Sequence, residues 1–211
     1  DYLFGKSLQL IHNKEDFELL PIYSKIAREL PMGELLQKDV LEKGIISRES
    51  YFSVIDNKTS SLLGASAYIG AKTAKTNEDY TQYAEEFGRL LGRAFQIKDD
   101  ILDFDTTQSN GKKSGNDIKE CKFTLPIIDY IEQLDDEVKP KVINFVKQKD
   151  KSDEDIMMLT LNISTSSSLK KTEAQVKYYS DKAKEVLKHL PENQGRKALE
   201  QLVEQLVERN N

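Results

Sequence analysis

Three aspartates, Asp99, Asp100 and Asp103, lie close together at the end of the stretch 88–103, which reads GRLLGRAFQIKDDILD. In a helix the positions i, i+1 and i+4 point in similar directions, so the three carboxylates are predicted to share an arc of about 100°. Like charges this close repel one another unless a cation or many waters lie between them. Mg²⁺ suits such a site because it binds carboxylate oxygens, keeps several waters and is completed by substrate phosphates. From the residue types alone, a solvated acidic surface is the commoner alternative to a metal site.

The residues around the aspartates favour a buried helix over an acidic surface. Apolar side chains flank the acids on nearly all sides: Phe95, Ile97, Ile101, Leu102 and Phe104. Buried carboxylates need partners, and the segment 111–122 downstream supplies lysines. Gly92 and Gly88, two and three turns before the acids, are predicted to leave room for a ligand. These features together indicate one half of a metal and diphosphate site.

Periodic apolar positions and capping residues predict that this helix is one of a series. We expect helices over 2–11, 16–41 with a kink or break at Pro31, 47–76, 78–104, 124–131, 136–148, 152–163, 168–190 and 195–208. Ser47 is the expected N-cap of the third, without a full capping box because Ser50 stands where Glu or Gln is usual. No strand pattern is present, so the fold class is predicted to be all-α, in a single domain spanning 1–211.

The composition excludes several classes of protein. The chain has 211 residues, of which 38% are hydrophobic and 32% charged, and its net charge of −5 argues against nucleic acid as a partner. Cys121 is the single cysteine, so no internal disulfide can form. No apolar run approaches the roughly 20 residues of a membrane span, and no signal peptide is apparent. We therefore predict a cytoplasmic protein.

Four sequence motifs resemble a known family when they are taken in order along the chain. The stretch FQIKDDILDFD, followed by GKKSGND and KFTLP, resembles the second aspartate-rich motif and following loop of the trans-type polyprenyl diphosphate synthases. The similarity extends upstream through GELLQ at 33–37, KTSSLLGAS at 58–66 and DYLF at 1–4. It covers about the first 130 residues in register and implies a bundle of long antiparallel helices around a central cavity.

The resemblance implies a role for each matching residue. Asp99, Asp100 and Asp103 would bind Mg²⁺, with Asp99 and Asp103 as the expected direct ligands. Lys58, Lys112 and Lys122 would bind diphosphate oxygens. Thr59 and Gln96 would direct their oxygen dipoles at the carbocation. Phe95 would line the isopentenyl side, and Gln37 with Glu34 would lie beside the allylic substrate. Without the resemblance, the lysines read as ordinary surface lysines and Glu34 with Gln37 as a surface pair.

The implied reaction is head-to-tail prenyl transfer. Mg²⁺ neutralises the departing diphosphate, the allylic bond ionises, isopentenyl diphosphate attacks the cation and a proton is lost. KFTLPIIDY and GELLQ look more like bacterial medium- or long-chain members than farnesyl synthases. Two alternatives remain open: a non-catalytic partner subunit, and a class I terpene cyclase. The loop lysines and the Lys58-Thr59 pair fit the synthases better.

The family also implies features that the printed residues do not contain. A first aspartate-rich motif and an arginine pair precede the DYL segment in the family, so we expect the chain to be incomplete at its N-terminus. A homodimer is expected as well, since the family forms one and long helices rich in small residues can pack closely.

Overall fold

The computed structural model describes residues 2–14, 17–74, 79–105 and 114–209, and every regular element in these ranges is helical. The all-α prediction is therefore confirmed. In chain order the elements are α1 (Tyr2–Asn13), η1 (Phe17–Leu19), α2 (Leu20–Lys43), α3 (Arg48–Ile55), η2 (Asp56–Ser60), α4 (Ser61–Thr73), α5 (Thr81–Leu102), α6 (Asn116–Lys119), α7 (Leu125–Glu132), α8 (Lys139–Lys147), α9 (Asp153–Thr165), α10 (Ser168–Leu187) and α11 (Gln194–Glu208).

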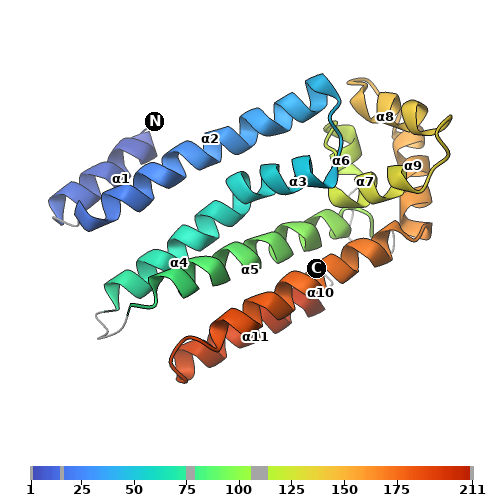
Figure 1. The fold of residues 1–211 in the computed structure, drawn as a ribbon. Coiled ribbons are helices and arrows are strands. Elements are labelled where there is room, and N and C mark those ends of the chain that lie inside the picture. Colours follow the sequence, from blue (N-terminus) through green and yellow to red (C-terminus); the bar gives the residue numbers. More distant parts are fainter. Residues whose placement is uncertain (1, 15–16, 75–78, 106–113, 210–211) are drawn as a thin grey trace.

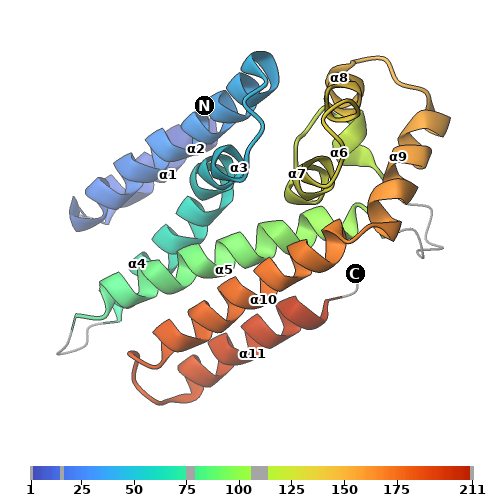
Figure 2. The same ribbon diagram turned by 45° about the vertical axis from the view of Figure 1, so that its right-hand side comes forward.

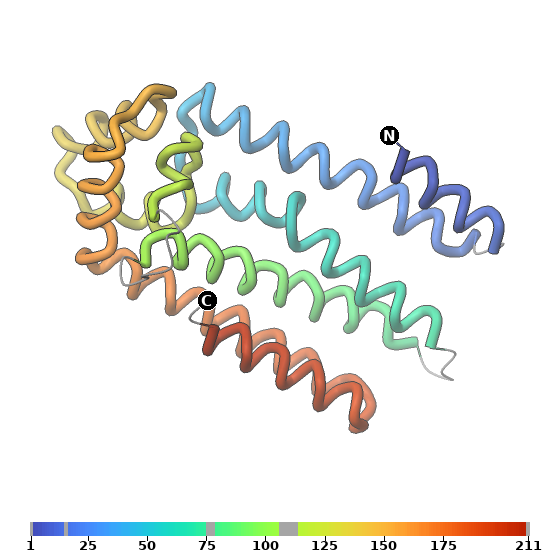
Figure 3. The backbone as a smooth tube through the Cα atoms, turned by 180° about the vertical axis from the view of Figure 1, so that it is seen from behind, coloured from blue at the N-terminus to red at the C-terminus, as the bar shows by residue number. Residues whose placement is uncertain are grey.

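The long helices run side by side, and α5 is at their centre. It packs against α4 on one side and α10 on the other, while α2 covers α3, η2 and α4 (Figure 1). The short helices α6 to α9 gather at one end of the bundle, as Figure 2 shows. Seen from behind in Figure 3, α1 lies outermost beside α2, and α11 lies beside α10. Fully buried Ala94 and Ile97 place α5 in the core.

The helix ends follow the local sequence closely. Gly44, with a φ of 70°, ends α2, and the Ser47 side chain accepts a hydrogen bond from the backbone N–H of Ser50 at the start of α3. The Ser50 hydroxyl in turn accepts from the N–H of Ser47, so a capping box forms with serine in place of Glu or Gln. The expectation of an incomplete box was wrong, because a hydroxyl can accept this bond as a carboxylate does.

Pro31 lies inside α2 without ending it. A proline within a helix removes one backbone hydrogen bond, at a cost of about 3 kcal/mol. Here α2 packs along its length against α3, η2 and α4, and this tertiary packing outweighs the local penalty. Gly33 and Gln37, which follow Pro31, therefore belong to the same helix as the residues before it.

The predicted single helix over 47–76 is interrupted by η2, which is five residues of π-helix. It includes Lys58 and Thr59. Two glycines border it closely. A Cβ on Gly33 of α2 would lie 2.8 Å from the backbone nitrogen of Lys58, and one on Gly92 of α5 would lie 2.6 Å from the Cα of Ser60. The expectation that Gly88 and Gly92 leave room for a ligand was therefore wrong. The backbone of α4 fills the space beside Gly88, and the backbone of η2 fills the space beside Gly92.

Gly92→Ala is expected to lower the free energy of unfolding by about 1–3 kcal/mol, because its new methyl group overlaps Ser60 and forces α5 and η2 apart. Gly70→Ala in α4 is the matched control, since nothing lies within 4 Å of its Cβ position and alanine favours a helix. Urea denaturation should show a lower midpoint for the first variant and an unchanged or higher midpoint for the second. Equal midpoints would contradict the close packing of α5 on η2.

Candidate functional site

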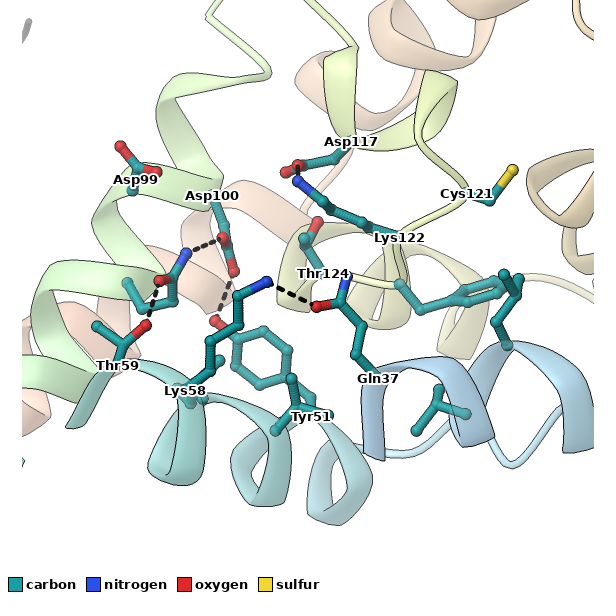
Figure 4. A pocket seen from close by; sticks show the side chains of 16 residues that line it. Gln37, Tyr51, Lys58, Thr59, Asp99, Asp100, Asp117, Cys121, Lys122 and Thr124 are labelled. Carbon is teal, nitrogen blue, oxygen red and sulfur yellow. Dashed lines mark hydrogen bonds and ion pairs between the residues drawn. The ribbon is translucent and has the colours of Figure 1, made fainter. Parts of the chain in front are cut away.

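A pocket of about 120 Å³ opens between α2, α3, η2, α5 and the segment 117–124 (Figure 4). It collects most of the side chains that the sequence analysis singled out: Gln37, Lys58, Thr59, Gln96, Asp99, Asp100 and Lys122. They come from four segments of the chain, namely α2, η2, α5 and the residues that follow α6. The pocket is therefore the candidate site, and both charged and apolar side chains line it.

A line of hydrogen bonds crosses the floor of the pocket from η2 to α5. The Thr59 hydroxyl donates to Oε1 of Gln96 at 2.8 Å, and Nε2 of Gln96 donates to Oδ1 of Asp100 at 3.0 Å. Tyr51 donates from its hydroxyl to Oδ2 of Asp100 at 2.5 Å. Because each partner has a defined donor or acceptor, the orientations of Thr59 and Gln96 are fixed.

Tyr51 is a site residue that sequence reasoning missed. It is buried in α3 and lines the pocket with its hydroxyl on Asp100. The two residues are 49 positions apart, so no periodic pattern in either helix links them. The one indication in the sequence is that a buried tyrosine needs a hydrogen-bond partner for its hydroxyl.

The three aspartates of α5 do not share one environment. Asp99 is exposed at the pocket rim and has no hydrogen-bond or ion-pair partner among the residues that the structure describes. Asp100 is only 4% exposed. Its burial, followed by the charge of Asp117, raises the pKa of the Asp100 carboxyl to about 8. One step of 100° around the helix thus separates an open carboxylate from a buried one.

Asp103 is directed at the start of α6. Its Oδ1 accepts from the N–H of Asn116 at 3.0 Å and its Oδ2 from the N–H of Asp117 at 2.9 Å. Asp103 thereby holds the segment that brings Asp117 and Lys122 to the pocket. Burial, followed by the charge of Asp103, raises the pKa of the Asp117 carboxyl to about 6. The three carboxylates were predicted to share one arc, and in the structure each has a different environment.

The donor chemistry of this region fits a hard cation. Within the described ranges, no three His, Cys, Asp or Glu side chains converge as a metal site. Among the described residues Asp99 has no partner for its carboxylate oxygens, and Asp103 is the C-cap of α5, one helical turn further on. Mg²⁺ needs few protein ligands because waters and phosphates complete its shell. An incomplete protein shell with an open carboxylate at the pocket rim is compatible with that requirement.

Two lysines line the pocket, and each is paired with acids. Nζ of Lys58 lies 2.9 Å from Oε1 of Glu34 and donates to Oε1 of Gln37 at 3.0 Å. Nζ of Lys122 lies 2.6 Å from Oε2 of Glu120 and 3.5 Å from Asp117. Both cations are partly exposed, so a stronger anion entering the pocket can compete for them.

Three predicted residues are not among the described residues that line this pocket: Phe95, Asp103 and Lys112. The side chain of Phe95 is exposed on α5, and the guanidinium carbon of Arg209 lies 5.9 Å from its ring centroid. The place of Phe95 beside the isopentenyl substrate therefore stays a prediction. Lys112 lies outside the described residues.

The free energy of unfolding should depend on pH through the protonation of the buried Asp100 carboxyl. The folded protein binds the Asp100 proton up to about pH 8, whereas the unfolded chain releases it near pH 3.9. The stability from this proton is complete below about pH 4 and is lost as the pH rises to about 8. We expect metal-free wild-type protein to lose more stability between pH 5.5 and 8 than Asp100→Asn, measured by urea denaturation in chelator. Parallel losses would contradict the shift.

Comparison with known proteins finds relatives of this chain. A family model described as polyprenyl synthetase matches residues 1–163. The short chain isoprenyl diphosphate synthase of Methanocaldococcus jannaschii is 34% identical over 161 residues, 74% of this chain and 49% of that protein. The octaprenyl diphosphate synthase of Haemophilus influenzae is 28% identical over 214 residues, covering 100% of this chain and 64% of its own length. The chain thus spans about half to two thirds of these curated relatives.

A solved structure has the same fold. The polyprenyl synthase of Caulobacter crescentus CB15, complexed with calcium and isoprenyl diphosphate, superimposes with a TM-score of 0.90 at 29% identity. The alignment covers 100% of this chain and 65% of that one. Within the described part of this chain, no helix is both long and apolar enough to cross a membrane.

Proposed function

Because this chain belongs to the polyprenyl synthetase family, we propose that the protein containing it adds isopentenyl diphosphate to an allylic diphosphate and releases a linear polyprenyl diphosphate. The observation that carries the proposal is the pocket in which Lys58 and Lys122 lie with Asp99 and Asp100 among the lining residues. Cations that can bind diphosphate oxygens thus line the same cavity as Asp99, a carboxylate that can bind a divalent cation. Few other reactions need both groups in one pocket that also has apolar lining residues.

Each side chain has a definite task in this proposal. Lys58 and Lys122 bind diphosphate oxygens by exchanging Glu34 and Glu120 for a stronger anionic partner. Thr59 donates its proton to Gln96, so the remaining lone pairs of its hydroxyl can face positive charge in the pocket. Asp99 and Asp103 would hold Mg²⁺, which supplies Lewis-acid neutralisation of the leaving diphosphate. Apolar pocket residues such as Ile55 and Phe123 exclude water from the cation.

The choice of ligands is supported by the relatives. The Caulobacter crescentus protein was obtained with calcium and isoprenyl diphosphate, which are a divalent cation and an anion of the proposed class. Mg²⁺ is proposed here because carboxylates, waters and phosphates form its usual shell. A homodimer, a cytoplasmic location and the absence of a nucleic-acid partner remain predictions from the sequence.

The proposal is tested by incubating the whole protein with Mg²⁺, isopentenyl diphosphate and an allylic diphosphate primer. We expect linear diphosphates longer than the primer, and none when the metal is chelated. Cyclised hydrocarbon would instead identify a terpene cyclase. Product formed only after addition of an active homologue would identify a non-catalytic partner subunit.

A further inference from the structure

The backbone of η2 departs from an α-helix at the residues to which the proposed function assigns binding. The N–H of Ser61 donates to the carbonyl of Asp56, five residues earlier. The carbonyl of Asn57, which an α-helix would have used, accepts the Ser61 hydroxyl at 2.6 Å instead. π-helical turns of this kind are rare and persist where the surrounding structure holds them. The contacts that hold η2 therefore determine the directions of Lys58 and Thr59.

Arg93 of α5 makes the most specific of these contacts. Its Nε and Nη2 donate to the two carboxylate oxygens of Asp56, the first residue of η2, at 2.6 Å each. Its guanidinium carbon lies 5.6 Å from the ring centroid of Phe52 and 5.2 Å from that of Tyr179. The bidentate ion pair fixes the orientation of the Asp56 carboxylate, and the two rings fix the position of the guanidinium. Arg93 thus joins η2 to α3, α5 and α10.

Loss of the π geometry would reorient the pocket. Reverting η2 to α-helix removes the equivalent of one inserted residue and turns the following side chains by about 100° relative to α3. Lys58 would leave Gln37, and Thr59 would leave Gln96. Both residues would then lose their directions toward the pocket while the helices stayed folded.

We propose that Arg93 is a positioning residue whose pair with Asp56 holds η2 in its π form and so directs Lys58 and Thr59 into the pocket. This inference rests on the proposed function, because it assigns a purpose to the placement of those two side chains. Arg93 is not one of the residues that line the pocket, so it is given no contact with the diphosphate. Its effect is transmitted through the backbone of η2.

Arg89 provides a matched control, one helical turn earlier on α5. It also forms two ion pairs, with Glu29 and Glu85 at 3.0 Å each, and its side chain is 30% exposed against 31% for Arg93. Neither of those partners belongs to η2. Arg89→Met and Arg93→Met should therefore lower the melting temperature of the whole protein by similar amounts, whereas only the second should alter the pocket.

The test measures kcat and KM for chain elongation, and the affinity for inorganic pyrophosphate with Mg²⁺ by calorimetry. We expect Arg93→Met to lower kcat by about 10–100-fold and to weaken pyrophosphate binding by about tenfold, the usual scale for residues that orient others. Arg93→Lys should recover part of both losses. Ser61→Ala, which leaves the Asn57 carbonyl without its hydroxyl partner, should change both quantities in the same direction.

Two results would overturn the inference. Equal changes in kcat and pyrophosphate affinity for Arg93→Met and Arg89→Met would show that Arg93 is only structural, while the proposed function stood. Wild-type protein that neither elongates a primer nor binds pyrophosphate would remove the proposed function, and the positioning role with it.

Discussion

Asp99→Asn is expected to lower the rate of isopentenyl transfer by about 10²–10³-fold. Asp99 is the carboxylate of α5 that lines the pocket without a partner among the described residues, and it is proposed to bind the metal. Asparagine keeps the shape and one oxygen but removes the charge. Removing one preorganised electrostatic group from a reacting centre lowers the rate by a factor of this size. The measurement is the rate of product formation at a series of Mg²⁺ concentrations, and a higher metal requirement should accompany the slower rate.

Asp181→Asn is the matched control for this change. Asp181 is an exposed aspartate of α10 outside the pocket, so the substitution removes the same charge from the surface. Its rate and its Mg²⁺ requirement should equal those of the wild type. A wild-type rate for Asp99→Asn would reject the assignment of this carboxylate to the metal.

Lys58→Ala should lower kcat/KM for the diphosphate substrates by about 10²-fold. The ammonium group lies in the pocket between Glu34 and Gln37, and the proposed anion would take the place of Glu34. Hydrogen bonds to charged groups contribute about 1.5–3 kcal/mol, or roughly 10–10²-fold. Steady-state kinetics with varied allylic diphosphate measures the change. Binding of pyrophosphate should weaken in parallel.

Lys177→Ala in α10 removes an exposed lysine from a helix face outside the pocket. It should leave both measurements unchanged, which separates a local contact from the general loss of one positive charge. If Lys58→Ala retained wild-type pyrophosphate affinity, the diphosphate would have to bind elsewhere in the protein. The ion pair between Lys58 and Glu34 would then have only a structural purpose.

The local sequence was sufficient for most helices and for the order of the site motifs. Apolar periodicity marks α5, Ser47 accepts the capping bond expected of it, and Gly44 ends α2. These features depend on interactions within a few residues, which a pattern in the sequence can describe. The assignment of Lys58, Gln96, Asp100 and Lys122 to one pocket came from the resemblance, and the structure brings those residues together.

Only the tertiary structure decided how the helices meet and which atoms face the pocket. The spacing of Asp99, Asp100 and Asp103 defines their angles around α5, but the neighbours of α5 decide that Asp100 is buried against Tyr51 and that Asp103 holds α6. Likewise, the glycines at 33 and 92 make room for η2 because two other helices approach there. A periodic pattern specifies direction around one axis. Burial, pairing and the π form of η2 depend on contacts between segments that are distant in the sequence, and those contacts exist only after the chain has folded.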